Sequence, residues 1–122
     1  MTLRGLHEAN AWVVILSNAA VGLWALGAHR WPRWRAGALW WATWAAWLTV
    51  FVQAFLGAAI TQVDDVEVDD MHALYGFSAI VAVGVIYSYR QQLADKKYLL
   101  YGLGGLFIMG LGIRNLFLTG AA

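Results

Sequence analysis

The sequence contains no cysteine, a single proline and few charged residues for its length. The lack of cysteine excludes a disulfide framework, a thiolate metal site and a thiol nucleophile, and with them the quinone-linked thiol oxidoreductases. Charged residues make up 12% of the 122 residues, whereas they are about a quarter of a typical soluble domain. The formal net charge is only +1. Because no basic stripe is available to neutralise phosphates, we expect no nucleic-acid partner.

Hydrophobic residues dominate what is present, at 61% of the chain, with eight tryptophans, five tyrosines and five phenylalanines. A soluble fold of this size has too small a core to bury so many aromatic side chains. Four segments hold the roughly 20 mainly apolar residues that a helix needs to cross a bilayer core of about 30 Å. These segments are residues 8–28, 37–61, 71–89 and 98–118. We therefore predict an all-α integral membrane four-helix bundle, with residues 1–122 as a single transmembrane domain.

The breaks between these segments differ in charge, and the difference predicts how the chain is oriented. Residues 29–36 and 90–97 carry three Lys or Arg each, whereas residues 62–70 carry five of the seven carboxylates. Basic loops are retained on the cytoplasmic side of a membrane. We predict a multi-pass protein of the cell membrane with cytoplasmic basic loops and an extracytoplasmic acidic loop. Both termini then lie on the outer side.

Under this topology the first and third segments run in the same direction, and each carries a histidine at its outer end, His7 and His72. The two imidazoles can therefore face each other across a bundle. His29 lies at the opposite end of the first segment, about 33 Å away at 1.5 Å per residue, so we interpret it as a solvated residue beside the membrane. Ala11 and Gly76 lie one turn below His7 and His72 on the same helix faces, which leaves clearance for a planar ligand.

This pattern predicts a b-type haem. Two neutral imidazoles, here His7 and His72, can supply both axial ligands of the iron, while apolar packing forms the rest of the site. Arg114 lies near the outer end of the last segment and is a candidate partner for the haem propionates. Gln53 and Gly76 come close to the same level and complete the candidate cofactor site. Such a protein would serve electron transfer or haem handling at the outer face.

The nearby carboxylates leave a second possibility, a divalent ion held by nitrogen and oxygen ligands. Zinc, iron or manganese accept such ligands. The candidate ligands are His7, Glu8, His72 and either Asp69 or Asp70. Their spacing matches no compact metal motif. The acidic run also has a simpler interpretation, as a solvated loop that keeps this segment outside the membrane and repels anions.

The second and third segments contain the runs FVQAFLGAAI and HALYGFSAIVAV, separated by a loop. This arrangement resembles the repeated four-helix unit of the haem A synthase family, in which a histidine opens one helix at the outer side. The next helix carries Gln followed by Leu-Gly, and a second histidine opens the helix after that. The matching positions here are His7, Gln53 with Leu56 and Gly57, and His72. The resemblance implies a four-helix bundle with a haem-ligating histidine pair on the outer side.

The sequence leaves the question of catalysis open. The family joins two such units and this chain has one, so it is not expected to be an enzyme on its own. Its serines lie in apolar helices without His or Asp at their depth, which disfavours nucleophilic catalysis. A competing hypothesis is a non-catalytic accessory or assembly subunit of a larger membrane complex. Trp44, Trp47 and Phe51 would then contact membrane lipid, other subunits or further copies of this chain.

Overall fold

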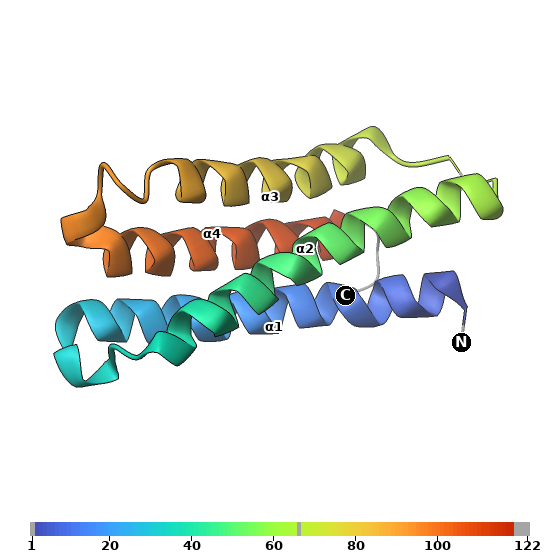
Figure 1. Ribbon diagram of the computed structural model, residues 1–122. Helices are drawn as coiled ribbons and strands as arrows, with labels where there is room; N and C mark the ends of the chain where they lie inside the picture. The colour runs from blue at the N-terminus through green and yellow to red at the C-terminus, as the bar shows by residue number, and fades with distance from the viewer. Residues whose placement is uncertain (1, 66, 119–122) are drawn as a thin grey trace.

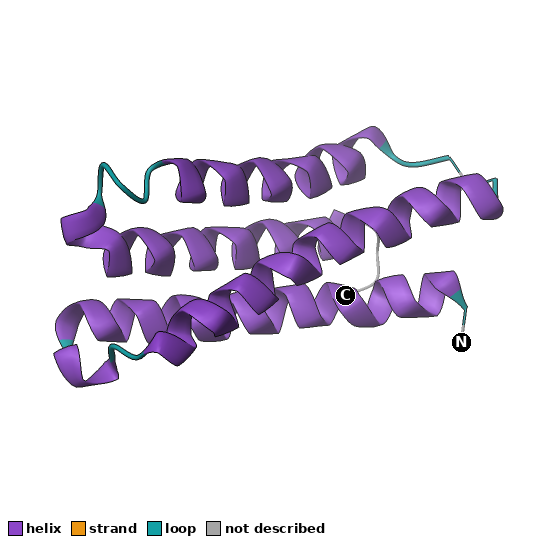
Figure 2. Ribbon diagram, viewed as in Figure 1, coloured by secondary structure: helices purple, strands orange, loops and turns teal. Residues whose placement is uncertain are grey.

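The computed structural model describes residues 2–65 and 67–118 (Figure 1). Residue 66 of the acidic loop and the chain ends at residues 1 and 119–122 lie outside the described residues. The elements are α1 (Leu3–Arg30), α2 (Gly37–Val63), α3 (Asp70–Ser88) and α4 (Lys97–Leu118), with short 3-10 helices at Pro32–Trp34 and Ala94–Lys96. All regular secondary structure in the described part is helical (Figure 2). Because α1 to α4 are each long and apolar enough to cross a membrane, the prediction of an all-helical chain with four candidate spans is confirmed.

The helices lie close to their predicted positions, with one difference at the N-terminus. α1 begins at Leu3, earlier than the predicted start at Glu8. Thr2 caps it, since its hydroxyl oxygen accepts a hydrogen bond from the backbone N–H of Gly5 at 2.9 Å, as is typical of threonine at this position. His7 consequently lies within the helix, in its second turn, where a regular backbone fixes the direction of its side chain.

The connection between α2 and α3 positions the other histidine. Asp65 adopts a positive φ of 51° just after α2, a conformation that aspartate tolerates better than most residues. Asp69 then caps α3, because its carboxylate accepts a hydrogen bond from the backbone N–H of His72 at 3.3 Å. The acidic loop thus begins α3 so that His72 lies in its first turn.

α1 and α4 form the central pair of the bundle. α2 packs against α1, and α3 packs against α4, whereas α2 and α3 contact each other only a little. In Figure 1 α2 runs obliquely across the other helices. The two outer helices are therefore held in place mainly through the central pair.

Glycines allow α1 and α4 to approach backbone to backbone. A Cβ atom added to Gly105 would lie 2.9 Å from the Cα of Gly22, and one added to Gly22 would lie 3.0 Å from the backbone nitrogen of Leu106. A Cβ on Gly102 would lie 2.9 Å from the backbone nitrogen of Leu26. Small residues at such positions are how membrane helices pack closely without a hydrophobic driving force.

The aromatic residues of α2 divide between the core and the surface. Trp47 is 3% exposed, and its ring stacks on that of Tyr101 with centroids 5.5 Å apart. Trp44 is 54% exposed and Phe51 is 38% exposed. The interpretation of Trp47 as a contact for lipid or a partner is therefore wrong, because the rotation of α2 turns this position toward α4. Trp44 and Phe51 do lie on the exposed surface of the bundle.

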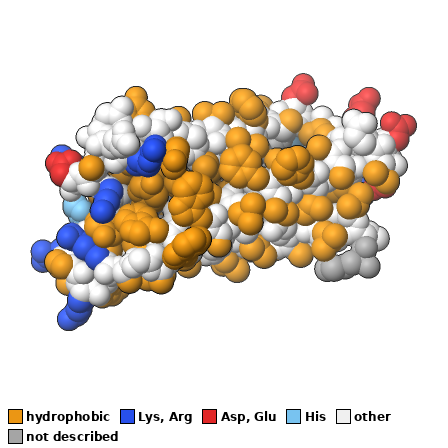
Figure 3. Space-filling view, in the orientation of Figure 1, with side chains coloured by type: hydrophobic (Ala, Val, Ile, Leu, Met, Phe, Trp, Pro, Cys, Tyr) orange, Lys and Arg blue, Asp and Glu red, His pale blue; other side chains and the backbone are white. Residues whose placement is uncertain are grey.

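Charged side chains gather at the two ends of the bundle, and the long face between them is hydrophobic (Figure 3). Lys and Arg cluster at the end that holds the α1–α2 and α3–α4 connections, and carboxylates cluster at the other end. We call these the basic end and the acidic end. A hydrophobic middle with charged ends is the distribution expected of helices that cross a bilayer.

Replacing Gly105 with alanine is expected to lower the free energy of unfolding by about 1–3 kcal/mol, the usual cost of overpacking a core. The added methyl group would press on the α1 backbone. Gly110→Ala is the matched control in the same helix, because nothing lies within 4 Å of a Cβ added there. Denaturation with sodium dodecyl sulfate in mixed micelles, followed by tryptophan fluorescence, measures both variants. Equal stabilities would contradict the close contact between α1 and α4.

Candidate functional site

A cavity of about 780 Å³ opens at the acidic end, and all four helices contribute to its wall. Its volume falls in the range of about 300–1,000 Å³ that is typical of small-molecule and cofactor sites. Its mouth carries the charged residues Arg4, Glu8, Glu67 and Asp69. Its floor is made of the buried apolar residues Val14, Val50, Ala79 and Ile108. The cavity therefore joins a polar entrance to an apolar interior, which suits an amphiphilic ligand.

His7 from α1 and His72 from α3 meet in this cavity. Their ring centroids are 6.0 Å apart, with the ring planes at 64° to each other, and both side chains are half-buried. A metal–nitrogen bond is about 2.0 Å long and each ring centre lies about 1 Å further out, so two imidazoles on opposite sides of one metal ion have centres about 6 Å apart. The structure thus brings the two histidines together at a spacing that fits one shared metal ion.

Asn115 on α4 orients the imidazole of His72. Its Oδ1 lies 2.8 Å from Nδ1 of His72. An amide oxygen only accepts hydrogen bonds, so this contact requires the proton on Nδ1 of His72, and in the neutral ring Nε2 then carries the lone pair. A hydrogen bond of this kind fixes the tautomer and orientation of a metal-ligating histidine. Gly76 lies beside this pair, since a Cβ added to it would come within 4.0 Å of the Asn115 amide nitrogen.

Gln53 lines the cavity, and its amide also ties α2 to α1 beneath His7. Its Nε2 donates to the backbone carbonyl of His7 at 2.8 Å, and its Oε1 accepts from the amide of Asn10 at 3.0 Å. The same Asn10 amide donates to the backbone carbonyl of Thr49 at 3.0 Å. Gly57 leaves the space next to the ring, because a Cβ there would lie 3.4 Å from Nε2 of His7. Gln53 therefore acts on His7 through the backbone.

The structure does not bring Arg114 to the histidines. Arg114 is exposed and does not line the cavity, whereas Arg4, from the first turn of α1, does. The reason is helical geometry, because successive residues are turned by about 100°. With Asn115 facing His72, its neighbour Arg114 points to another side of α4. Among the described residues, Arg4 is thus the Lys or Arg that lines this cavity.

The carboxylates do not join the histidines in a metal cluster. Within residues 2–65 and 67–118, no group of three or more His, Asp or Glu side chains is arranged to hold a metal ion. Glu8 and Asp69 lie at the cavity mouth, but Asp70 does not line the cavity. The carboxylate of Asp69 is already engaged by the backbone N–H of His72. The predicted alternative, a divalent ion held by these carboxylates together with both histidines, has no support in the described geometry.

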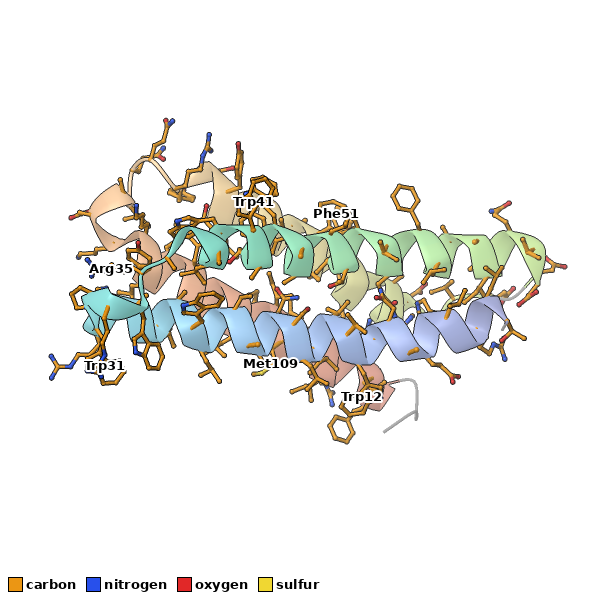
Figure 4. All side chains as sticks on the ribbon, turned by 60° about the horizontal axis from the view of Figure 1, so that its bottom comes forward. Trp12, Trp31, Arg35, Trp41, Phe51 and Met109 are labelled. Carbon is orange, nitrogen blue, oxygen red and sulfur yellow. The ribbon has the colours of Figure 1, made fainter. Side chains whose placement is uncertain are left out.

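His29 lies far from this site, at the basic end. Its side chain is exposed, and its backbone carbonyl accepts a hydrogen bond from the guanidinium of Arg35 at 3.3 Å. Figure 4 shows Arg35 and Trp31 at that end of the bundle. His29 therefore fits the interpretation of a solvated residue next to the membrane.

Asn115 stands out in the sequence only as a polar residue near the outer end of the last apolar segment, and sequence reasoning missed Asn10 and gave Arg4 no role in the site. Each acts through a contact between helices that are distant in sequence, as in the pairing of Asn115 with His72. The one available signal was the presence of polar residues inside apolar spans, since such residues tend to face the bundle interior.

No protein-family model, curated protein sequence or solved structure matches this chain. The resemblance to the haem A synthase family stays a sequence-based hypothesis. The features that bear on function are consequently the geometry of His7 and His72 and the cavity around them.

Replacing Gln53 with leucine is expected to lower the free energy of unfolding by about 1 kcal/mol, because the Asn10 amide and the His7 carbonyl each lose a partner. Gln62→Leu is the matched control, since Gln62 is exposed near the end of the same helix. A double-mutant cycle with Asn10→Ala, measured by denaturation in micelles, isolates the coupling between the two amides. A coupling of zero would rule out the hydrogen bond between the Asn10 and Gln53 amides.

Proposed function

We propose that this protein is a small integral membrane protein that holds one b-type haem between His7 and His72, for electron transfer or haem handling. The observation that carries the proposal is the pair of half-buried imidazoles from two helices, with centroids 6.0 Å apart in a cavity of about 780 Å³. A bound haem would supply one-electron redox chemistry, whose potential depends on the axial ligands and on the hydrogen bonds and burial around them.

The residues of the cavity suit such a group. Apolar side chains form its floor, and small residues leave room beside the histidines, namely Ala11, Gly57, Ala73 and Gly76. Arg4 at the mouth can pair with a carboxylate such as a haem propionate. These features match the shape and the amphiphilic character of haem.

The surrounding residues act on the two ligands. Asn115 accepts a hydrogen bond from the Nδ1–H of His72. This hydrogen bond leaves Nε2 to bind a metal and raises the basicity of Nε2 as a ligand. Gln53 holds the backbone of His7 in place by donating a hydrogen bond to the His7 carbonyl oxygen. The apolar floor keeps water from the buried side of the site, and a drier site alters the redox potential of a bound metal.

We also infer that the basic loops at residues 29–36 and 90–97 are cytoplasmic and that the acidic loop at residues 62–70 and both termini are outside. The separation of basic and acidic side chains between the two ends of the bundle supports this orientation (Figure 3), because basic loops are retained in the cytoplasm. The haem cavity would then face the outer side of the cell membrane.

An exposed stripe on α2 favours a second candidate function, that of an accessory subunit in a larger membrane complex. Its residues recur at intervals of three and four positions: Trp41, Trp44, Leu48, Phe51 and Phe55. Trp41 and Phe51 project from α2 on the side away from α1 (Figure 4). A large apolar stripe with this period suits lengthwise contact with another helix, from a different subunit or from a second copy of this chain.

Titration of haem into the purified protein in detergent is expected to give a Soret band that saturates at one haem per chain. His7→Ala and His72→Ala should each abolish the saturable band, because each removes one of the two axial ligands. His29→Ala is the matched control and should bind haem as the wild type does, since His29 lies at the opposite end of α1. Circular dichroism of each variant confirms that the helices remain intact.

Two outcomes of the titration would overturn the haem proposal. Wild-type protein that takes up no haem would leave the accessory role as the better candidate. A saturable band that survives both histidine substitutions would show that haem binds elsewhere on the chain.

A further inference from the structure

A second cavity, of about 750 Å³, lies between α3 and α4, outside the histidine site. It is a surface groove, because its walls are exposed apolar side chains from both helices, among them Leu74, Val81, Val85, Leu103 and Phe107. Ser78 and Lys96 are the polar residues in its lining. The groove is thus almost wholly apolar, and its one charged lining residue, Lys96, precedes α4 at the basic end.

The length of the groove matches one leaflet of a bilayer. Its lining on α3 runs from Leu74 to Ile86, about 18 Å at 1.5 Å per residue. Half of a hydrocarbon core is about 15 Å thick. An acyl chain that enters at Lys96 would therefore lie along the groove to about the middle of the membrane.

Lys96 differs from the neighbouring cations of the α3–α4 connection. The guanidinium of Arg90 lies 3.7 Å from the ring centroid of Tyr87, and the ammonium of Lys97 lies 5.5 Å from that of Trp40. Lys96 is the cation that lines the groove, and no acidic side chain lines it with Lys96 among the described residues. Its charge is thus available to an anion at the end of the groove.

We propose that this groove binds one anionic phospholipid, with an acyl chain between α3 and α4 and the headgroup phosphate on Lys96. Basic pockets between membrane helices at the cytoplasmic side are typical sites for anionic headgroups. A phospholipid fits better than a protein helix, because its headgroup supplies an anion for Lys96, and the large side chains of Leu103 and Phe107 make the wall of the groove irregular. A flexible acyl chain follows such an irregular wall more readily. The proposal does not depend on haem binding.

Native mass spectrometry of the full chain in detergent tests the headgroup contact, with phosphatidylglycerol and phosphatidylcholine of identical acyl chains as probes. Phosphatidylglycerol is expected to bind more tightly to the wild type. Lys96→Gln should weaken this binding about fivefold, as expected for removing one lysine from an anionic headgroup. Lys97→Gln is the matched control, with the same loss of charge one residue away, and should bind as the wild type does.

The acyl contact is tested by Val85→Trp, which should block the groove and remove the binding of both lipids. Val85 is 49% exposed, so a larger side chain there extends into the groove and leaves the core in place. Leu23→Trp on α1 is the control, because Leu23 is also exposed and lines neither cavity.

Three outcomes would overturn the proposal. Equal losses of phosphatidylglycerol binding in Lys96→Gln and Lys97→Gln would show that the lipid responds to the overall positive charge of this end and not to Lys96 in particular. Unchanged lipid binding in Val85→Trp, with native circular dichroism, would show that the acyl chain of the lipid does not lie in this groove. A wild-type dimer that binds no lipid and that Val85→Trp converts to a monomer would identify a second copy as the occupant.

Discussion

The close backbone contact between α1 and α4 is the constraint on which the rest of the structure depends. Gly22 and Gly105 let these helices meet with no side chain between them, and the outer helices α2 and α3 attach one to each member of this pair. Because α2 and α3 contact each other little, the relative position of His7 on α1 and His72 on α3 is set mainly through α4. The separation of the two imidazoles is thus a consequence of how tightly the central helices pack.

Hydrogen bonds between helices then determine the detail of the site. Polar groups inside a membrane are costly unless they find partners, and at this site the side chains of Gln53 and Asn115 find theirs on neighbouring helices. Gln53 holds the backbone of His7, and Asn115 holds the ring of His72. Each histidine is therefore oriented by a different helix from its own. The other ring nitrogen of His72 is not used in the contact with Asn115, and the floor of the cavity around it is apolar.

The number and approximate bounds of the helices could be predicted because the length of an apolar run is a direct physical requirement of crossing a bilayer. The position of His7 and His72 at one end of helices that run in the same direction also followed from topology, whereas the contact between their rings is seen only in the structure. The rotation of each helix about its axis could not be predicted, because nearly all faces of these helices are apolar. For this reason the sequence could place Arg114 at the depth of the site but could not show that it is absent from the cavity wall, and it assigned Trp47 to the surface.

The central claim is that both histidines ligate one haem iron. Electron paramagnetic resonance of the ferric, haem-loaded protein tests it most directly, because two nitrogen ligands give a low-spin iron and the loss of one gives a high-spin iron. We expect a low-spin signal from the wild type and a high-spin signal from any haem that a single-histidine variant retains. A high-spin signal from the wild type at full occupancy would contradict the ligation of one iron by His7 and His72.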